Sequence, residues 1–152
     1  MSRTISIGGA SGFWGDAALA TPQLLAGGEL DYIVYDYLAE VTMSIMARAR
    51  AADDSKGYAT DFITAVLARN LGEISRQGVK VIANAGGVNP QACAEAARAL
   101  IAEQGLDLKV ATVLGDDLMG ERESFSASDA REMFNGESFP DTDKIASINA
   151  YL

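Results

Sequence analysis

One stretch of aliphatic residues that runs into two glycines and a proline most constrains the fold of this chain. Residues 79–83 have the length and the β-branched composition of a buried strand. Gly86 and Gly87 then allow a tight turn. Asn89 is a favourable helix N-cap, and Pro90 suits the first position of a helix. The stretch therefore predicts a strand, a turn and a helix whose first N–H groups and dipole favour an anion.

Similar aliphatic segments recur along the chain and are separated by helical patterns. The predicted strands cover residues 4–8, 32–36, 79–84 and 108–114. Strands that alternate with helices form a mostly parallel sheet, and right-handed connections place the turns that follow the strands at one edge. We therefore predict an α/β fold with a mainly parallel sheet and helices on both faces. Part of a (βα) barrel is the alternative, because the pattern does not distinguish open from closed sheets.

Length and composition limit the classes of protein. The 152 residues correspond to a single α/β domain, residues 1–152, which ends where a further strand–helix unit would begin and is expected to be the N-terminal part of a longer protein. The net charge of −9 argues against a nucleic-acid surface and gives no basic face for anionic lipid. No apolar stretch is long enough to span a bilayer, and the expected location is cytoplasmic.

The absence of histidine restricts the chemistry further. With no histidine and a single cysteine, the chain contains no Ser-His-Asp triad, no histidine-ligated zinc and no internal disulfide. Acid–base chemistry must then use Asp, Glu, Lys, Tyr or Cys93. Carboxylates also leave a hard cation such as Mg²⁺ possible.

The predicted edge at the carboxyl ends of the strands collects the polar residues of interest. Asp36 and Asp116 are the candidate catalytic carboxylates, since each follows a predicted strand. If a metal binds, its candidate ligands are Asp16, Asp116 and Asp117. The candidate binding residues for a small anionic ligand are Gly9, Ser11, Gly12, Asn84, Gly86, Gly87 and Asn89.

Residues 9–15 have the spacing G-x-x-G-x-x-G after a predicted strand. This resembles the phosphate loop of extended short-chain dehydrogenases, and Asp36 lies about 20 residues further on, where a ribose-binding carboxylate is expected. An NAD(P)-binding domain is therefore one alternative. The Tyr-x-x-x-Lys pair of those enzymes is absent from the chain, and the likeness is better explained by the shared physics of α/β turns.

The order of the motifs resembles a second family over nearly the whole chain. Residues 7–16, 30–44, 84–90 and 115–117 are similar to successive signatures of the acyclic terpene utilisation (AtuA-like) family, formerly a domain of unknown function. The resemblance implies a soluble protein of the catabolism of acyclic terpenes or branched acyl-CoA compounds. Members of that family are longer, so the resemblance also implies an N-terminal part. It supplies neither a reaction nor catalytic residues.

These observations lead to three hypotheses. The first is a metabolic enzyme, or its N-terminal part, that holds an anionic acyl compound such as a CoA thioester on the amides of residues 84–89, with Asp36 or Asp116 as base. The second is the NAD(P)-binding dehydrogenase domain. The third is a non-catalytic binding or assembly module. The predicted helix at residues 38–51 is apolar around much of its circumference, which predicts a homo-oligomer. Tyr32, Tyr35 and Tyr37 are interpreted as packing and interface residues.

Overall fold

A computed structural model describes residues 4–150 of the chain. The chain divides into two compact units, Met1–Thr112 and Val113–Leu152. Among the described residues, no helix has both the length and the apolar character that crossing a membrane would require.

The first unit is built on a parallel sheet of three strands, β1 (Ile7–Ser11), β2 (Tyr32–Tyr35) and β3 (Lys80–Ala83). Their order in the sheet is their order in the chain, β1-β2-β3. Both neighbouring pairs are parallel, so the predicted α/β class with a mainly parallel sheet is confirmed. The sheet of the described residues is open and does not close into a barrel.

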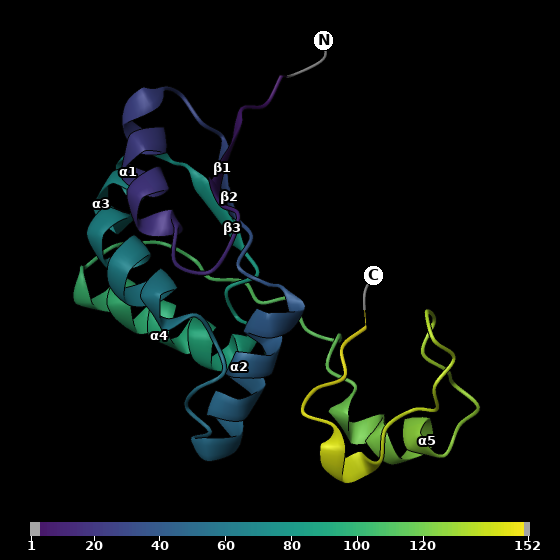
Figure 1. Cartoon of the computed structure of the whole chain (residues 1–152). Coiled ribbons are helices and arrows are strands. Elements are labelled where there is room, and N and C mark those ends of the chain that lie inside the picture. Colours follow the sequence, from purple (N-terminus) through teal and green to yellow (C-terminus); the bar gives the residue numbers. More distant parts are fainter. Residues whose placement is uncertain (1–3, 151–152) are drawn as a thin grey trace. The chain divides into compact units, whose positions relative to one another are not determined.

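Helices connect the strands, and Figure 1 shows α1 and α3 on the same side of the sheet. This follows from the strand order, because two successive right-handed crossovers in one direction put their helices on one face. The helical elements of this unit are α1 (Ala17–Gly27), α2 (Glu40–Ala52), the π-helical turn η1 (Phe62–Leu67), α3 (Ala68–Gln77) and α4 (Pro90–Glu103).

The two faces of the sheet differ in burial. Ile33 and Tyr35 of the central strand are buried beneath the helices, whereas Ile7 and Ile82 on the opposite face are 56% and 54% exposed. Among the described residues, helices thus pack on one face of the sheet. A second layer would need a strand added beyond β1, with crossovers in the reverse direction.

Residues 108–114 do not form the predicted fourth strand. Leu108 and Val110 are half-buried against the core, and the carbonyl oxygen of Val110 accepts a hydrogen bond from Arg98 Nη2 at 3.1 Å. The segment is in no strand ladder of the described residues. A β-favouring composition predicts a surface suited to a sheet, but this segment uses its apolar side chains to pack on the core and pairs with neither edge strand, β1 or β3.

The core of the first unit contains a group of three aromatic rings next to the carboxyl end of β2. The ring centroids of Tyr35 and Phe62 lie 5.4 Å apart, and those of Tyr37 and Phe62 lie 5.8 Å apart, both edge-on. Tyr35 and Tyr37 are each 1% exposed. This packing attaches η1 to the end of β2 and fixes the chain where the sheet ends.

The second unit has little regular structure. It contains η2 (Met119–Glu121), α5 (Arg122–Ser126) and η3 (Thr142–Lys144). Phe125 and Phe139 stack with their centroids 5.8 Å apart. All residues from 113 to 150 are exposed or half-buried, so hydrophobic burial within this unit contributes little to its stability.

Asn89 does more than cap a helix. Its Oδ1 accepts the N–H of Ala92 at 3.4 Å, as the sequence predicts, and its Nδ2 donates to the carbonyl oxygens of Asp54 and Lys56 at 2.9 and 2.8 Å. The residue is 8% exposed. It therefore holds the loop that follows α2 against the start of α4.

We expect Asn89→Ala to lower the free energy of unfolding by about 2–3 kcal/mol, because it removes the cap and leaves two loop carbonyls without their donor. Asn89→Ser keeps a cap acceptor and loses only the loop contacts, so its cost is expected to be smaller. Urea unfolding of both variants measures the difference. Equal costs would mean that the cap contributes nothing.

Candidate functional site at the carboxyl edge of the sheet

Three of the predicted site residues meet where the three strands end. Asn84 Nδ2 donates to Asp36 Oδ1 at 2.7 Å, and Ser11 Oγ lies 3.0 Å from the carbonyl oxygen of Asp36. Asn84 Oδ1 accepts the backbone N–H of Tyr37 at 2.6 Å. The last residue of β1 and the first residues after β2 and β3 are thereby joined into one polar group, which we call the edge triad (Ser11, Asp36 and Asn84).

The edge triad is open to solvent, since Asp36 and Asn84 are both exposed. In it the Asn84 amide is hydrogen-bonded to the Asp36 carboxylate, and the Ser11 hydroxyl is hydrogen-bonded to the Asp36 backbone. The amide orientation is fixed from both ends, because Asn84 accepts from backbone and donates to a carboxylate. Such a group can orient a polar ligand and offer a carboxylate base.

The amides of the glycine turn take part in hydrogen bonds within the protein. The N–H groups of Gly87, Val88 and Asn89 donate to the carbonyl oxygens of Asn84, Gly57 and Gly86, at 3.2, 3.0 and 2.9 Å. Three of the amides that were expected to hold an anion thus donate within the turn or to the preceding loop. These hydrogen bonds fix the conformation of the turn.

Both glycines are required by close packing. Gly87 has φ +51°, and a Cβ there would overlap Met46 Sδ and lie 2.8 Å from the carbonyl oxygen of Gly57. A Cβ on Gly86 would lie 2.8 Å from the Cα of Pro90. The space on the Cβ side of both glycines is filled by protein, so a larger residue does not fit at either position.

The loop between β1 and α1 carries its own carboxylate. Asp16 Oδ2 accepts the N–H of Gly12 at 2.9 Å. In a dinucleotide-binding loop such amides face the pyrophosphate, and a carboxylate here would repel that group. Gly9, by contrast, has no atom within 4 Å of a Cβ built on it, so the backbone there is accessible.

A buried polar cluster that sequence reasoning missed lies beside the edge triad. Trp14 Nε1 donates to Asp61 Oδ1 at 2.5 Å, which joins the β1–α1 loop to the residue before η1. Within the described residues, two buried polar atoms have no hydrogen-bond partner, Tyr37 Oη and Asp16 Oδ1. The sequence marked Tyr37 only as a packing residue, and no local signal distinguishes it from Tyr35.

The environment of the cluster keeps its phenol and thiol protonated. Burial raises the pKa of Tyr37, and the neighbouring charges of Asp61 and Asp16 raise this pKa further. Burial also raises the pKa of Cys93 to about 11. Tyr37 is therefore a neutral hydrogen-bond donor at physiological pH, and Cys93 is not a thiolate nucleophile.

The remaining predicted carboxylates belong to the second unit. Asp116 Oδ2 accepts from Asn149 Nδ2 at 2.9 Å, and Asp117 Oδ1 accepts the N–H of Met119 at 2.9 Å. They were expected beside Asp36 because of a strand at residues 108–114, and without that strand the reasoning no longer applies. Over residues 4–150, no group of three or more metal-ligating side chains of His, Cys, Asp or Glu is found.

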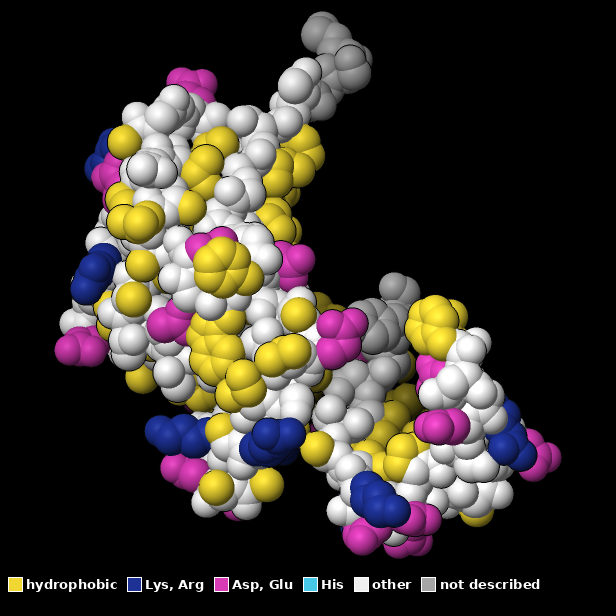
Figure 2. All heavy atoms as spheres, viewed as in Figure 1, with side chains coloured by type: hydrophobic (Ala, Val, Ile, Leu, Met, Phe, Trp, Pro, Cys, Tyr) yellow, Lys and Arg dark blue, Asp and Glu magenta, His cyan; other side chains and the backbone are white. Residues whose placement is uncertain are grey.

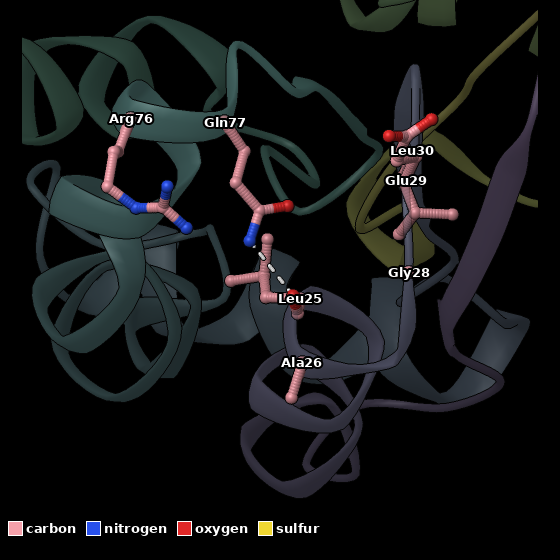
Figure 3. Close-up of a pocket in the computed structure, with 7 residues that line it drawn as sticks. All are labelled: Leu25, Ala26, Gly28, Glu29, Leu30, Arg76 and Gln77. Atoms are coloured by element: carbon pink, nitrogen blue, oxygen red, sulfur yellow. Dashed lines mark hydrogen bonds between the residues drawn. The ribbon is translucent and has the colours of Figure 1, made fainter.

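A surface hollow of about 520 Å³ lies at the other end of the first unit. Figure 3 shows it between the end of α1, the segment before β2 and the end of α3, with Gln77 Nε2 donating to the carbonyl oxygen of Leu25 at 2.9 Å. The charged residue Arg76 is paired with Glu73. None of the predicted site residues lines this hollow.

Fold and site together define an α/β protein with a polar group at the carboxyl edge of a parallel sheet. The chain belongs to the acyclic terpene utilisation (AtuA) family, whose model, described as "Acyclic terpene utilisation family protein AtuA", matches residues 5–152. Comparisons with curated proteins and with solved structures gave no significant match. Membership of this family suggests a role in acyclic terpene utilisation.

We expect Gly87→Ala to lower the free energy of unfolding by about 2–4 kcal/mol, through the strained backbone and the overlap with Met46. Gly72→Ala is the matched control, since Gly72 lies in the exposed part of α3 with no neighbour within 4 Å of a Cβ. It should be stabilising by about 0.5–1 kcal/mol. Urea unfolding measures both. A tolerated Gly87→Ala would mean that the turn has room for a ligand.

Proposed function

We propose that this chain is the N-terminal part of an AtuA-family protein of acyclic terpene or branched acyl catabolism, and that it binds an acyl compound such as a CoA thioester at the edge triad. The meeting of Ser11, Asp36 and Asn84 carries this proposal. Family membership supports the terpene connection.

An apolar surface next to the edge triad suits the hydrocarbon part of such a ligand. On the face of the sheet away from α1, the strand register sets Gly9 beside Val34, and Val34 beside Ile82. Ile7 and Ile82 on this face are more than half exposed. An acyl chain lying on these residues would remove apolar surface from water while its carbonyl group reached the triad.

Within this proposal the triad residues have separate roles. Asn84 Nδ2 has a second hydrogen that it can donate to a ligand oxygen, and Ser11 Oγ, which donates to the carbonyl oxygen of Asp36, can accept a hydrogen bond from the ligand. Asp36 is the candidate base because its carboxylate is exposed and held by Asn84. In this proposal Asn84 Nδ2 is the donor that recognises the carbonyl or carboxylate. The reaction that Asp36 would serve is proton abstraction from the bound acyl compound.

Asp36→Asn tests the role of this carboxylate, because it keeps the size of the side chain and an acceptor for Asn84. We expect turnover of a branched acyl-CoA thioester to fall at least about 100-fold while the unfolding midpoint is retained. The matched control is Asp107→Asn, which makes the same charge change at an exposed position after α4. Equal turnover in both variants would exclude Asp36 as the base.

Self-association is the second part of the proposal. Val41 and Ile45 lie one helical turn apart on α2 and are 71% and 48% exposed, and Figure 2 shows hydrophobic side chains on the surface of the first unit. Such neighbouring apolar residues favour an interface between copies of the chain.

We expect sedimentation velocity to give a dimer or larger oligomer for the wild-type chain, and a monomer for the double variant Val41→Glu, Ile45→Glu. Leu19→Glu is the control, because Leu19 is 77% exposed on α1. A wild-type chain that sediments as a monomer at high concentration would contradict this part of the proposal.

A further inference from the structure

Phe13 is an aromatic residue that the folded protein leaves in water. It is 65% exposed, although it lies next to Trp14 in the loop between β1 and α1. Trp14 packs against the core, and its Nε1 donates to Asp61 Oδ1 at 2.5 Å. The two adjacent aromatic residues thus have different environments, and packing within the protein accounts only for Trp14.

The β1–α1 loop is held by hydrogen bonds on both sides of Phe13. The N–H of Gly12 donates to Asp16 Oδ2 at 2.9 Å. Ser11 Oγ lies 3.0 Å from the carbonyl oxygen of Phe13 itself, and the side chain of Trp14 anchors the residue that follows. Because the backbone at Phe13 is already fixed, a ligand that contacts the ring orders little further chain, and this favours binding.

Ser11 also places Phe13 beside the edge triad. Its Oγ lies 3.0 Å from the carbonyl oxygen of Asp36 as well as from that of Phe13, so the hydroxyl hydrogen is shared between the two. Because both distances are 3.0 Å, these two carbonyl oxygens are at most about 6 Å apart. A ligand held at the triad therefore lies next to the residue that carries the exposed ring.

The surroundings indicate which part of a ligand the ring complements. Exposed and buried residues alternate along β1, which sets Ser11 on the same face of the sheet as Ile7 and Gly9. This is the apolar face on which the acyl chain of the proposed ligand lies. The loop and the triad each contribute a carboxylate, Asp16 and Asp36, so a phosphate group is disfavoured here and a hydrocarbon is favoured.

We propose that Phe13 is a specificity-determining residue that covers the first carbons of an acyl chain whose carbonyl group is held at the edge triad. The ring and the apolar sheet face then contact the chain from two sides, whereas the open face alone covers only one. This inference rests on the proposed function, because it assumes an acyl ligand at the triad. It adds that the site selects the acyl part of a thioester and not its CoA part.

The first test asks whether the ring serves the fold. Phe13→Ala in the full chain is expected to keep the melting temperature within about 2 °C of wild type, since truncation of an exposed side chain has little effect on stability. Phe134→Ala is the matched control, because it removes the same side chain at an 88% exposed position of the second unit. A larger fall in Phe13→Ala alone would contradict the inference, because the ring would then be structural.

The second test uses butanoyl-CoA, octanoyl-CoA and free CoA, titrated by calorimetry into wild type, Phe13→Ala and Phe134→Ala. We expect Phe13→Ala to bind both thioesters about five- to tenfold more weakly than wild type, and Phe134→Ala to bind them as wild type does. Free CoA should not distinguish the three proteins. Phe13→Leu, which keeps an apolar side chain, is expected to retain most of the affinity.

The outcomes separate this inference from the proposed function. Wild-type affinity of Phe13→Ala for both thioesters would overturn the role of Phe13 and leave the proposed function standing. An equal loss of affinity for free CoA would also overturn it, because the ring would then contact the CoA part of the ligand. If neither thioester binds to wild type, both the inference and the proposed function are wrong.

Discussion

The packing of Tyr35 and Tyr37 against Phe62 is the interaction on which the rest of the first unit depends. These side chains join the end of the central strand to η1, and both tyrosines are almost fully buried. Because Asp36 lies between the two tyrosines, its carboxylate is turned outward at the edge of the sheet, where Asn84 reaches it. Successive side chains of an extended chain point to opposite sides, so the same stretch places the tyrosines in the core and the Asp36 carboxylate at the accessible edge.

The surroundings of this strand end use their polar groups in two ways. The glycine turn after β3 satisfies its own amides and fits closely around Met46 and Gly57, so it is a rigid support. The Tyr37 and Asp16 atoms are buried without partners within the described chain. A buried polar atom without a hydrogen bond lowers the stability of the folded protein. Such atoms are commonly retained where they have a functional role.

Much of the first unit could be predicted from local patterns. The aliphatic runs predicted three strands, and the structure places them at Ile7–Ser11, Tyr32–Tyr35 and Lys80–Ala83. The first begins three residues later than predicted, where Ile7 pairs with Tyr32. It continues to Ser11 through two glycines, whose low strand preference explains why the predicted strand ended at residue 8. The strand predicted at residues 108–114 was wrong, because the segment packs on the core through Leu108 and Val110 and pairs with neither edge strand of the sheet. The expectation for Asp116 depended on that strand.

The sequence by itself determined the α/β class and the family. It also determined that Ser11, Asp36 and Asn84 lie at the same edge of the sheet, since parallel strands with right-handed connections end at one edge. It also determined the N-cap at Asn89, which is a local interaction. Only the tertiary structure decided that Gly87 is enclosed by Met46, and that Tyr37 lacks the partner that Tyr35 has in Thr21. The physical reason is that turn chemistry and strand pattern are local, whereas the pairing of a buried polar atom depends on segments that meet only in the folded chain.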